Sequence, residues 1–287
     1  MSATITSLQA AAYGLVQGLT EFLPISSTAH LRIVPAIFGW HFYGGSTNDP
    51  GAAFTAIVQL GTTLAIVVYF WRELLHVTVA WIRGLYDRSV RGSLEYRMGW
   101  YLILATVPVS VFGLIFSDQI ETGARNLWLI AGALIGLAVL LFAAEKAGRR
   151  DRVEEQITTA DAVVVGTAQA LALIPGASRS GTTITAGLFR GLTREAAARF
   201  SFLLSIPAVV LSGLYEAARM GSKHENSPGA GLIGVAVVVA FVVGLASIHW
   251  LMRWLANHST FLFIYYRIAL GVLLIVLLST GVLSATT

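Results

Sequence analysis

The sequence predicts an all-α integral membrane protein with six transmembrane helices and two re-entrant helical hairpins, arranged as an inverted repeat. Three observations predict this class. Hydrophobic residues make up 56% of the 287 residues and charged residues 12%, against about 25% charge in an ordinary soluble protein. Several apolar runs have the length of a membrane span. Two broken, polar motifs recur in the same order in the two halves of the chain.

The apolar runs are long enough to decide between a membrane and a soluble protein. A helix needs about 20 apolar residues to cross a hydrocarbon core of about 30 Å. The runs that approach this length are residues 52–71, 100–116, 127–144, 195–215, 230–250 and 261–278. Glycine is frequent within them, as expected where helices pack closely in lipid. The mean hydropathy of +0.73 agrees, and we reject buried helices of a soluble protein.

Other features of the composition exclude several classes of protein. The first residues carry no positive stretch and no cleavage site, so we predict no signal peptide. The absence of cysteine excludes disulfides, iron–sulfur clusters and thiolate zinc sites. A net charge of +4 requires no nucleic-acid partner, and we expect none.

An internal repeat organises the chain. GLVQGLTEFLPISSTAH (residues 14–30) resembles GTAQALALIPGASRSGTT (residues 166–183). With a one-residue gap, the matching positions are Gly14, Gln17, Pro24 and Ser27 against Gly166, Gln169, Pro175 and Ser178. A second pair of similar segments follows, FTAIVQLGTTLAIVVY from Phe54 and FSFLLSIPAVVLSGLY from Phe200. We therefore divide the single membrane domain, 1–287, into a half 1–147, a solvated polar linker 148–157 and a half 158–287.

The repeated motifs are too polar and too broken to span lipid. Irregular backbone at membrane depth is tolerated where it is buried in protein or lines a wet cavity. We therefore expect each motif to form the bend of a re-entrant hairpin, followed by three crossings. An odd number of crossings gives the halves opposite orientations, with the functional site at the interface between the repeats.

The distribution of basic residues predicts the orientation. One side receives Arg72, Arg83, Arg88, Arg91, Arg97, Lys146, Arg149, Arg150, Arg152, Arg194 and Arg253. The other side receives chiefly Arg32, Arg125, Arg219 and Lys223. The positive-inside rule places the first group in the cytoplasm. Both termini and the mouth of the first hairpin are then expected outside.

The first motif, QGLTEFLPISSTAH, concentrates polar side chains in an apolar context. Gln17 and Glu21 are four residues apart and share one helical face, and Pro24 ends that helix. The polar residues after the break are Ser26, Ser27, Thr28 and His30. An ionisable group at the bilayer centre costs roughly 2.5–3.5 kcal/mol. The pattern indicates a nucleophile, a proton-transfer group and a carboxylate that binds a metal or a proton. A capped helix start with an interfacial glutamate is the alternative, but a cap needs one hydroxyl.

The second motif, IPGASRSGTT, has the features of a phosphate site. A proline and a glycine turn the chain, and Ser178 and Ser180 are placed to cap a helix beginning near Gly181. The free N–H groups at a helix start bind anions. Arg179 adds a planar fork that suits two phosphate oxygens. The alternative is that Arg179 only reaches toward the membrane interface.

Together, QGLTEFLPISSTAH and PGASRSGTT resemble the motifs of the undecaprenyl-diphosphatase family, also called the bacitracin-resistance protein family. The resemblance runs along nearly the whole chain. It implies six spans with two re-entrant hairpins, in a multi-pass protein of the plasma membrane. The implied activity is hydrolysis of undecaprenyl diphosphate to undecaprenyl phosphate and inorganic phosphate. This recycles the lipid carrier for peptidoglycan and other wall polymers, on the extracytoplasmic side.

The resemblance also assigns residues. Those that match the family's essential positions are Glu21, Ser27, His30 and Arg179. We expect a further polar set to bind substrate, namely Gln17, Ser26, Thr28, Ser178, Ser180 and Thr183. The chain departs from the family at Gln17, where glutamate is frequent, and at Ala29, where glycine is usual. The first departure puts a metal site with two carboxylates in doubt.

A mechanism follows as an expectation. Ser27 attacks the terminal phosphorus and His30 is the general base and later the acid. Arg179 and the helix N-terminus stabilise the developing charge. Glu21 either orients His30 or holds a divalent cation, Mg²⁺ or Ca²⁺. His30 as the nucleophile is an alternative.

The main rival function is a secondary transporter or lipid flippase, because inverted repeats with broken helices also describe transporters. The serine, threonine, histidine and arginine set suits covalent phosphate chemistry better than ion coupling. The sequence leaves open a homodimer, the identity of any metal, prenyl-chain selectivity and whether the protein also flips its product.

Overall fold

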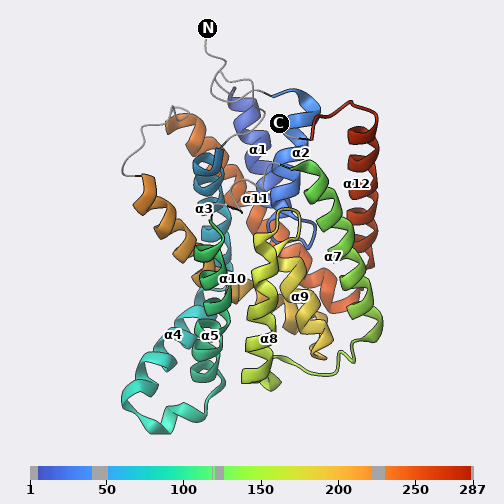
Figure 1. The fold of residues 1–287 in the computed structure, drawn as a ribbon. Coiled ribbons are helices and arrows are strands. Elements are labelled where there is room, and N and C mark those ends of the chain that lie inside the picture. Colours follow the sequence, from blue (N-terminus) through green and yellow to red (C-terminus); the bar gives the residue numbers. More distant parts are fainter. Residues whose placement is uncertain (1–5, 41–50, 118, 120–125, 221–229, 286–287) are drawn as a thin grey trace.

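The structure, a computed structural model, describes residues 6–40, 51–117, 119, 126–220 and 230–285 (Figure 1). Its α-helices are α1 (Ser7–Thr20), α2 (Ser27–Phe38), α3 (Gly51–Tyr69), α4 (Trp71–Tyr86), α5 (Leu94–Ile115), α7 (Leu127–Ala147), α8 (Thr159–Gln169), α9 (Arg179–Phe189), α10 (Arg194–Met220), α11 (Ala230–Asn257) and α12 (Phe261–Ser279). Short 3-10 helices are η1 (Arg88–Gly92), η2 (Glu154–Gln156) and η3 (Ala170–Leu173). Arg125 and Lys223, which entered the orientation prediction, lie outside the described residues.

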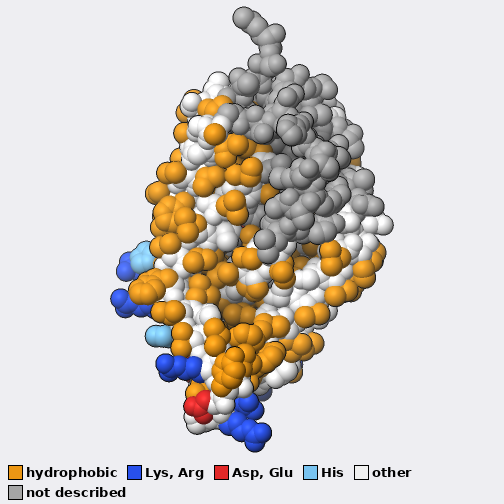
Figure 2. All heavy atoms as spheres, turned by 90° about the vertical axis from the view of Figure 1, so that its left-hand side faces the viewer, with side chains coloured by type: hydrophobic (Ala, Val, Ile, Leu, Met, Phe, Trp, Pro, Cys, Tyr) orange, Lys and Arg blue, Asp and Glu red, His pale blue; other side chains and the backbone are white. Residues whose placement is uncertain are grey.

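The long apolar runs form helices that can cross a membrane, as predicted. Among the described residues, 5 helices are long and apolar enough, or up to 6 if α3 and α4 count as one span with a 75° bend. The long helices are α5, α7, α10 up to Ser212, α11 and α12. Their outward faces are apolar, and hydrophobic side chains cover much of the described surface in Figure 2, with Lys and Arg toward its lower end. This division fits a protein whose flanks face lipid.

Local sequence determines where several helices begin. Thr6 and Gln9 form a capping box at the start of α1, and Thr158 and Asp161 form one at the start of α8. The Asn126 side chain accepts hydrogen bonds from two backbone N–H groups of α7. Each cap satisfies N–H groups that a helix cannot pair internally. The two capping boxes therefore fix the outer ends of the two arms that lead to the motifs.

The two motifs form two helical hairpins whose bends meet near the middle of the molecule. In Figure 1, α1 and α2 occupy the upper half, and α8 and α9 occupy the lower half. Ser26 and Ser178 have positive φ angles of 75° and 73°, and each side chain caps the helix that follows. Non-glycine residues adopt such angles only where the surroundings impose them. The two bends therefore share the same local geometry.

The cap of α9 differs in one detail from the prediction. Ser178 alone is the N-cap, with its Oγ 3.2 Å from the backbone nitrogen of Gly181, and α9 begins at Arg179. Ser180, also expected to cap, donates instead to the backbone oxygen of Leu23 at 3.1 Å. Because a helix has one N-cap position, the second serine is free to join the two bends.

The outer arm of each hairpin packs closely against a long helix of the other half of the chain. A side chain at Gly14 of α1 would place its Cβ 2.3 Å from the backbone oxygen of Ala236 in α11. A side chain at Gly166 of α8 would place its Cβ 2.4 Å from the oxygen of Ala105 in α5. Real Cβ atoms do not approach this closely, so glycine allows the backbones to touch.

The linker 148–157 was expected to be solvated, and many of its side chains are exposed, but two of its arginines are anchored to buried carboxylates. Arg150 pairs with the buried Glu145 at 2.8 Å, and Arg152 pairs with Asp161 of α8 at 2.6 Å. Arg152 also forms an isolated β-bridge with Leu192. The buried carboxylates need cationic partners, and the nearby linker supplies them. The linker thus ties α7 to the lower hairpin.

We predict that Gly166→Ala destabilises the protein by roughly 1–3 kcal/mol, because the added methyl group overpacks the α8–α5 contact. The measurement is thermal unfolding in detergent. Gly132→Ala in α7 is the matched control, since nothing lies within 4 Å of its Cβ position. Both substitutions bring the same gain in helix propensity. Equal melting temperatures for the two variants would contradict the close approach of α8 and α5.

Candidate active site

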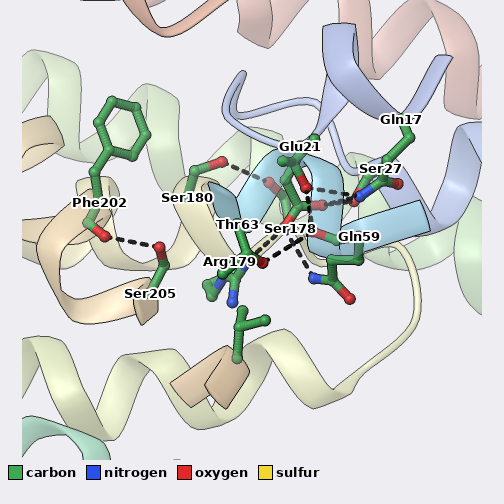
Figure 3. Close-up of polar contacts among 12 residues, drawn as sticks. Gln17, Glu21, Ser27, Gln59, Thr63, Ser178, Arg179, Ser180, Phe202 and Ser205 are labelled. Atoms are coloured by element: carbon green, nitrogen blue, oxygen red, sulfur yellow. Dashed lines mark hydrogen bonds and ion pairs between the residues drawn. The ribbon is translucent and has the colours of Figure 1, made fainter. Parts of the chain in front are cut away.

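The carboxylate of Glu21 is the junction of the site. Glu21 follows α1 directly and is 9% exposed. Its donors are Gln17 Nε2 at 3.0 Å, Ser27 Oγ at 2.7 Å, Gln59 Nε2 at 3.0 Å, and Arg179 Nη2 (Figure 3). They come from α1, α2, α3 and α9. One buried carboxylate therefore connects both motifs and the span α3.

Ser27 is held with its hydroxyl directed at a base. It is the first residue of α2, and its Oγ donates to Glu21 Oε2. A carboxylate at 2.7 Å is within reach of the hydroxyl proton. Adjacent bases activate hydroxyl nucleophiles in this way. The geometry therefore favours Glu21 as the group that can accept the proton of Ser27.

Arg179 brings the second motif to the first, as the repeat predicts. It is the first residue of α9, and its guanidinium forms an ion pair with Glu21. The side chain of Arg179 is 21% exposed and that of Glu21 is 5% exposed. The pair is largely removed from water, where losing one partner would leave an uncompensated charge. Arg179 is thus the cation that pairs with the carboxylate of the site.

His30 lies differently from its expected role. Its Nδ1 is 2.7 Å from the backbone oxygen of Ser26, and its Nε2 is 2.6 Å from the hydroxyl of Tyr266. A carbonyl oxygen only accepts, so Nδ1 carries the proton, and a neutral ring then accepts from Tyr266 through Nε2. The two rings also stack, with centroids 5.6 Å apart. In this arrangement neither ring nitrogen of His30 is directed at Ser27, and Glu21 does not orient His30.

The predicted substrate-binding serines and threonines mostly support the bends. Ser26 and Ser178 are buried N-caps, and Ser180 bonds across to the first bend. Thr183 is fully buried, with its hydroxyl 2.5 Å from that of Ser201 in α10. These hydroxyls face protein, so their described role is to hold the backbone in place.

A pocket opens beside the Glu21–Arg179 pair. Its lining residues are Glu21, Phe22, Thr62, Thr63, Ile66, Arg179, Ser205, Ile206 and Val209. Most of these come from α3 and α10. The pocket is small, and it places the ion pair and hydroxyls next to hydrophobic side chains.

Sequence reasoning missed Gln59 and Tyr266. Gln59 binds Glu21, and Tyr266 binds His30. Both lie inside runs interpreted only as spans, 52–71 and 261–278. A signal was present for Gln59. It and the pocket residue Ser205 occupy equivalent positions in the second pair of similar segments, five residues after Phe54 and Phe200. For Tyr266, the adjacent Arg267 inside an apolar run was the available signal.

The donor set at Glu21 fits a divalent cation poorly. Hard cations prefer several oxygen ligands and more than one carboxylate. Here the carboxylate faces amide N–H groups, a hydroxyl donor and the guanidinium of Arg179. Among the described residues, no cluster of three or more His, Asp or Glu side chains could hold a metal. The buried Oε1 of Gln17 has no hydrogen-bond partner within the described part of the chain and remains a spare oxygen beside Glu21.

Comparison with known proteins places the chain among close relatives along its whole length. The profile of the family described as "Bacitracin resistance protein BacA" matches residues 10–273. An undecaprenyl-diphosphatase of Nocardia farcinica is 47% identical over 321 aligned residues, covering 100% of both chains. Undecaprenyl-diphosphatases of Mycolicibacterium smegmatis and Chlorobium phaeovibrioides are each 50% identical, covering 97% of this chain and 99% of theirs.

We predict that Gln17→Glu creates tighter binding of a divalent cation, because a second carboxylate raises ligand charge next to Glu21. Mn²⁺ binding, followed by electron paramagnetic resonance of the free ion, should show a lower dissociation constant than in the wild type. Gln9→Glu, in the exposed first turn of α1, is the control. Identical Mn²⁺ titrations of all three proteins would mean that position 17 is not a ligand.

Proposed function

The chain belongs to the bacitracin resistance protein BacA family, and we propose that it is a membrane phosphatase that hydrolyses undecaprenyl diphosphate to undecaprenyl phosphate and inorganic phosphate. The observation that carries the proposal is the meeting of Ser27, Glu21 and Arg179 beside a small pocket lined partly by hydrophobic side chains. Product undecaprenyl phosphate returns to the synthesis of wall polymers. Relatives named as diphosphatases along the whole chain disfavour the transporter alternative.

The first step is phosphoryl transfer to Ser27. Glu21 takes the proton of the Ser27 hydroxyl as Oγ forms a bond to the terminal phosphorus. The bond from that phosphorus to the bridging oxygen breaks, and undecaprenyl phosphate leaves. The hydrogen bond of 2.7 Å between Ser27 and Glu21 supports this order of proton transfer.

The second step is hydrolysis of the phosphoserine. A water molecule attacks phosphorus, and the bond from phosphorus to the Ser27 oxygen breaks. Glu21, protonated in the first step, donates its proton to the leaving Ser27 oxygen, and both protons of the water stay on the released phosphate. Inorganic phosphate is released and the starting state is restored. No step requires a metal, in keeping with the donors around Glu21.

Arg179 supplies the compensating charge. Free enzyme pairs its guanidinium with Glu21. A bound diphosphate offers two oxygens of higher charge, for which a planar guanidinium is well suited. The N–H groups of the first turn of α9 lie beside Arg179 and favour the same anion. Transfer of the guanidinium from Glu21 to phosphate would also free the carboxylate to act as a base.

His30 serves as support in this proposal. Its Nδ1 proton binds the carbonyl of Ser26, the residue directly before Ser27. It thereby orients the strained residue that sets the direction of the nucleophile. Attack by His30 itself would first require Tyr266 to release Nε2, which makes Ser27 the better nucleophile.

The fold proposal is six spans and two re-entrant hairpins in an inverted repeat, with halves 1–147 and 158–287. The paired contacts of Gly14 with Ala236 and of Gly166 with Ala105 support it. The shared backbone geometry of Ser26 and Ser178 gives further support. The site then lies at the interface between repeats, where inverted-repeat proteins place theirs. We place the protein in the plasma membrane with this site facing outward.

We predict that the purified protein releases phosphate from undecaprenyl diphosphate and that Arg179→Lys lowers kcat by about 10²-fold or more. Lysine keeps the charge but cannot bind two phosphoryl oxygens in one plane. Phosphate release is measured with and without EDTA, over a range of substrate concentrations.

Arg190→Lys in the cap of α9 is the control, because Arg190 pairs with Asp161 away from the pocket lining. Wild-type turnover in the Arg179→Lys variant would mean that Arg179 only joins the hairpins. Wild-type protein without phosphate release would refute the proposed activity.

We also predict that Thr28→Cys reacts with a membrane-impermeant thiol reagent in right-side-out vesicles, and that a diphosphate analogue slows this reaction. Thr28 is exposed and follows Ser27 directly, whereas Ser26 is too buried to report. The chain contains no native cysteine, so labelling is specific.

Arg149→Cys in the linker, at a position where the native side chain is 84% exposed, should react only after permeabilisation. If the reagent labelled the linker but not position 28 from outside, the true orientation of the protein would be the opposite of the predicted one.

A further inference from the structure

One buried arginine contacts both bends. Arg267 lies in α12 and is 1% exposed. Its hydrogen bonds run to the backbone oxygens of Pro24 at 3.1 Å, Ala133 at 3.3 Å, Leu134 at 3.1 Å, Gly176 at 3.2 Å and Ala177 at 3.0 Å. All these acceptors are carbonyl groups. Arg267 thus binds backbone and does not neutralise a carboxylate in the described contacts.

Three of the acceptors belong to the two bends and lie just before the reactive residues in the chain. Pro24 precedes Ser27 by three residues, and Ala177 precedes Arg179 by two. Nη1 reaches the first bend, whereas Nη2 reaches the second. The rigid, planar guanidinium therefore sets the distance between the two bends. A lysine ammonium, as a single point, cannot bind both bends and α7 at once.

Room for this guanidinium is built into α9. A Cβ at Gly181 would lie 2.9 Å from Arg267 Nη1. Glycine at this position leaves that space open, so the first turn of α9 and the guanidinium fit together. This observation concerns shape and is independent of the hydrogen bonds.

The cost of burying the group points to a function beyond packing. Burying a charged side chain at membrane depth costs free energy, so such a residue is by default expected to have a function. The bends also leave carbonyl groups without helical partners, and little water is present to satisfy them. Arg267 satisfies carbonyls from both bends with one cation, and the partial negative charges of these oxygens compensate it.

We propose that Arg267 is a positioning residue for phosphoryl transfer. By fixing the separation of the two bends, it holds Arg179 against Glu21 and Ser27 without touching the substrate. The inference rests on the proposed function for its kinetic consequence. Misplacement of catalytic groups by about 1 Å can lower a rate by about 10²-fold.

The test combines kinetics with a distance measurement. Spin labels are attached to Phe38→Cys and Phe189→Cys, exposed residues at the far ends of α2 and α9. Arg267→Lys should shift or broaden the distance distribution between the labels. Without labels, it should lower kcat by at least about 10-fold while KM changes by less than about 3-fold. Arg253→Lys, at an exposed position of α11, is the control and should change neither quantity.

Two outcomes overturn the proposal. One is an unchanged distance distribution in folded Arg267→Lys protein, and the other is a changed distribution with wild-type kcat. If Arg267→Lys does not fold, Gly181→Ala takes its place, because it displaces the guanidinium and keeps the arginine. Wild-type behaviour of that variant in both measurements also overturns the proposal. A wild-type enzyme without phosphatase activity would refute the proposed function alone, since the distances still report whether Arg267 sets the spacing.

Discussion

The bends of the two hairpins place polar backbone deep inside an apolar protein, and each polar group there needs a partner within the chain. Two side chains contribute at this centre, one by binding side-chain donors and the other by binding backbone carbonyls. Glu21 collects donors from both motifs and from α3. Arg267 donates to carbonyls of both bends and of α7. A carboxylate that accepts hydrogen bonds and a guanidinium that donates them therefore hold the centre together.

The same interactions prepare the chemistry. Glu21 and Arg179 neutralise each other before substrate binds, so neither charge is buried alone. In the proposed mechanism, a diphosphate that binds the guanidinium leaves the Glu21 carboxylate next to the Ser27 hydroxyl and free to accept its proton. The ion pair is thus a stable resting form of the groups to which the proposed mechanism assigns the reaction.

A second polar layer anchors the lower hairpin. The buried Glu145 of α7 binds Arg150, Arg194 and the hydroxyl of Thr260. Asp161 at the start of α8 binds Arg152 and Arg190. Because these carboxylates are almost fully buried, their cationic partners are required and not optional. The position of the α8–α9 hairpin relative to the spans follows from this layer.

The sequence by itself determined the membrane class, the apolar helices and the two motifs, and it made Glu21, Ser27 and Arg179 candidate site residues. Those features are local: the length of the apolar runs, a spacing of four residues on a helix, and polar residues around a helix break. Only the tertiary structure decided the partners. His30 pairs with Tyr266, Glu21 with Gln59, and the bends with Arg267. The physical reason is that these partners come from distant spans. A single polar residue in an apolar run indicates that it has a function, but it does not indicate which group it contacts.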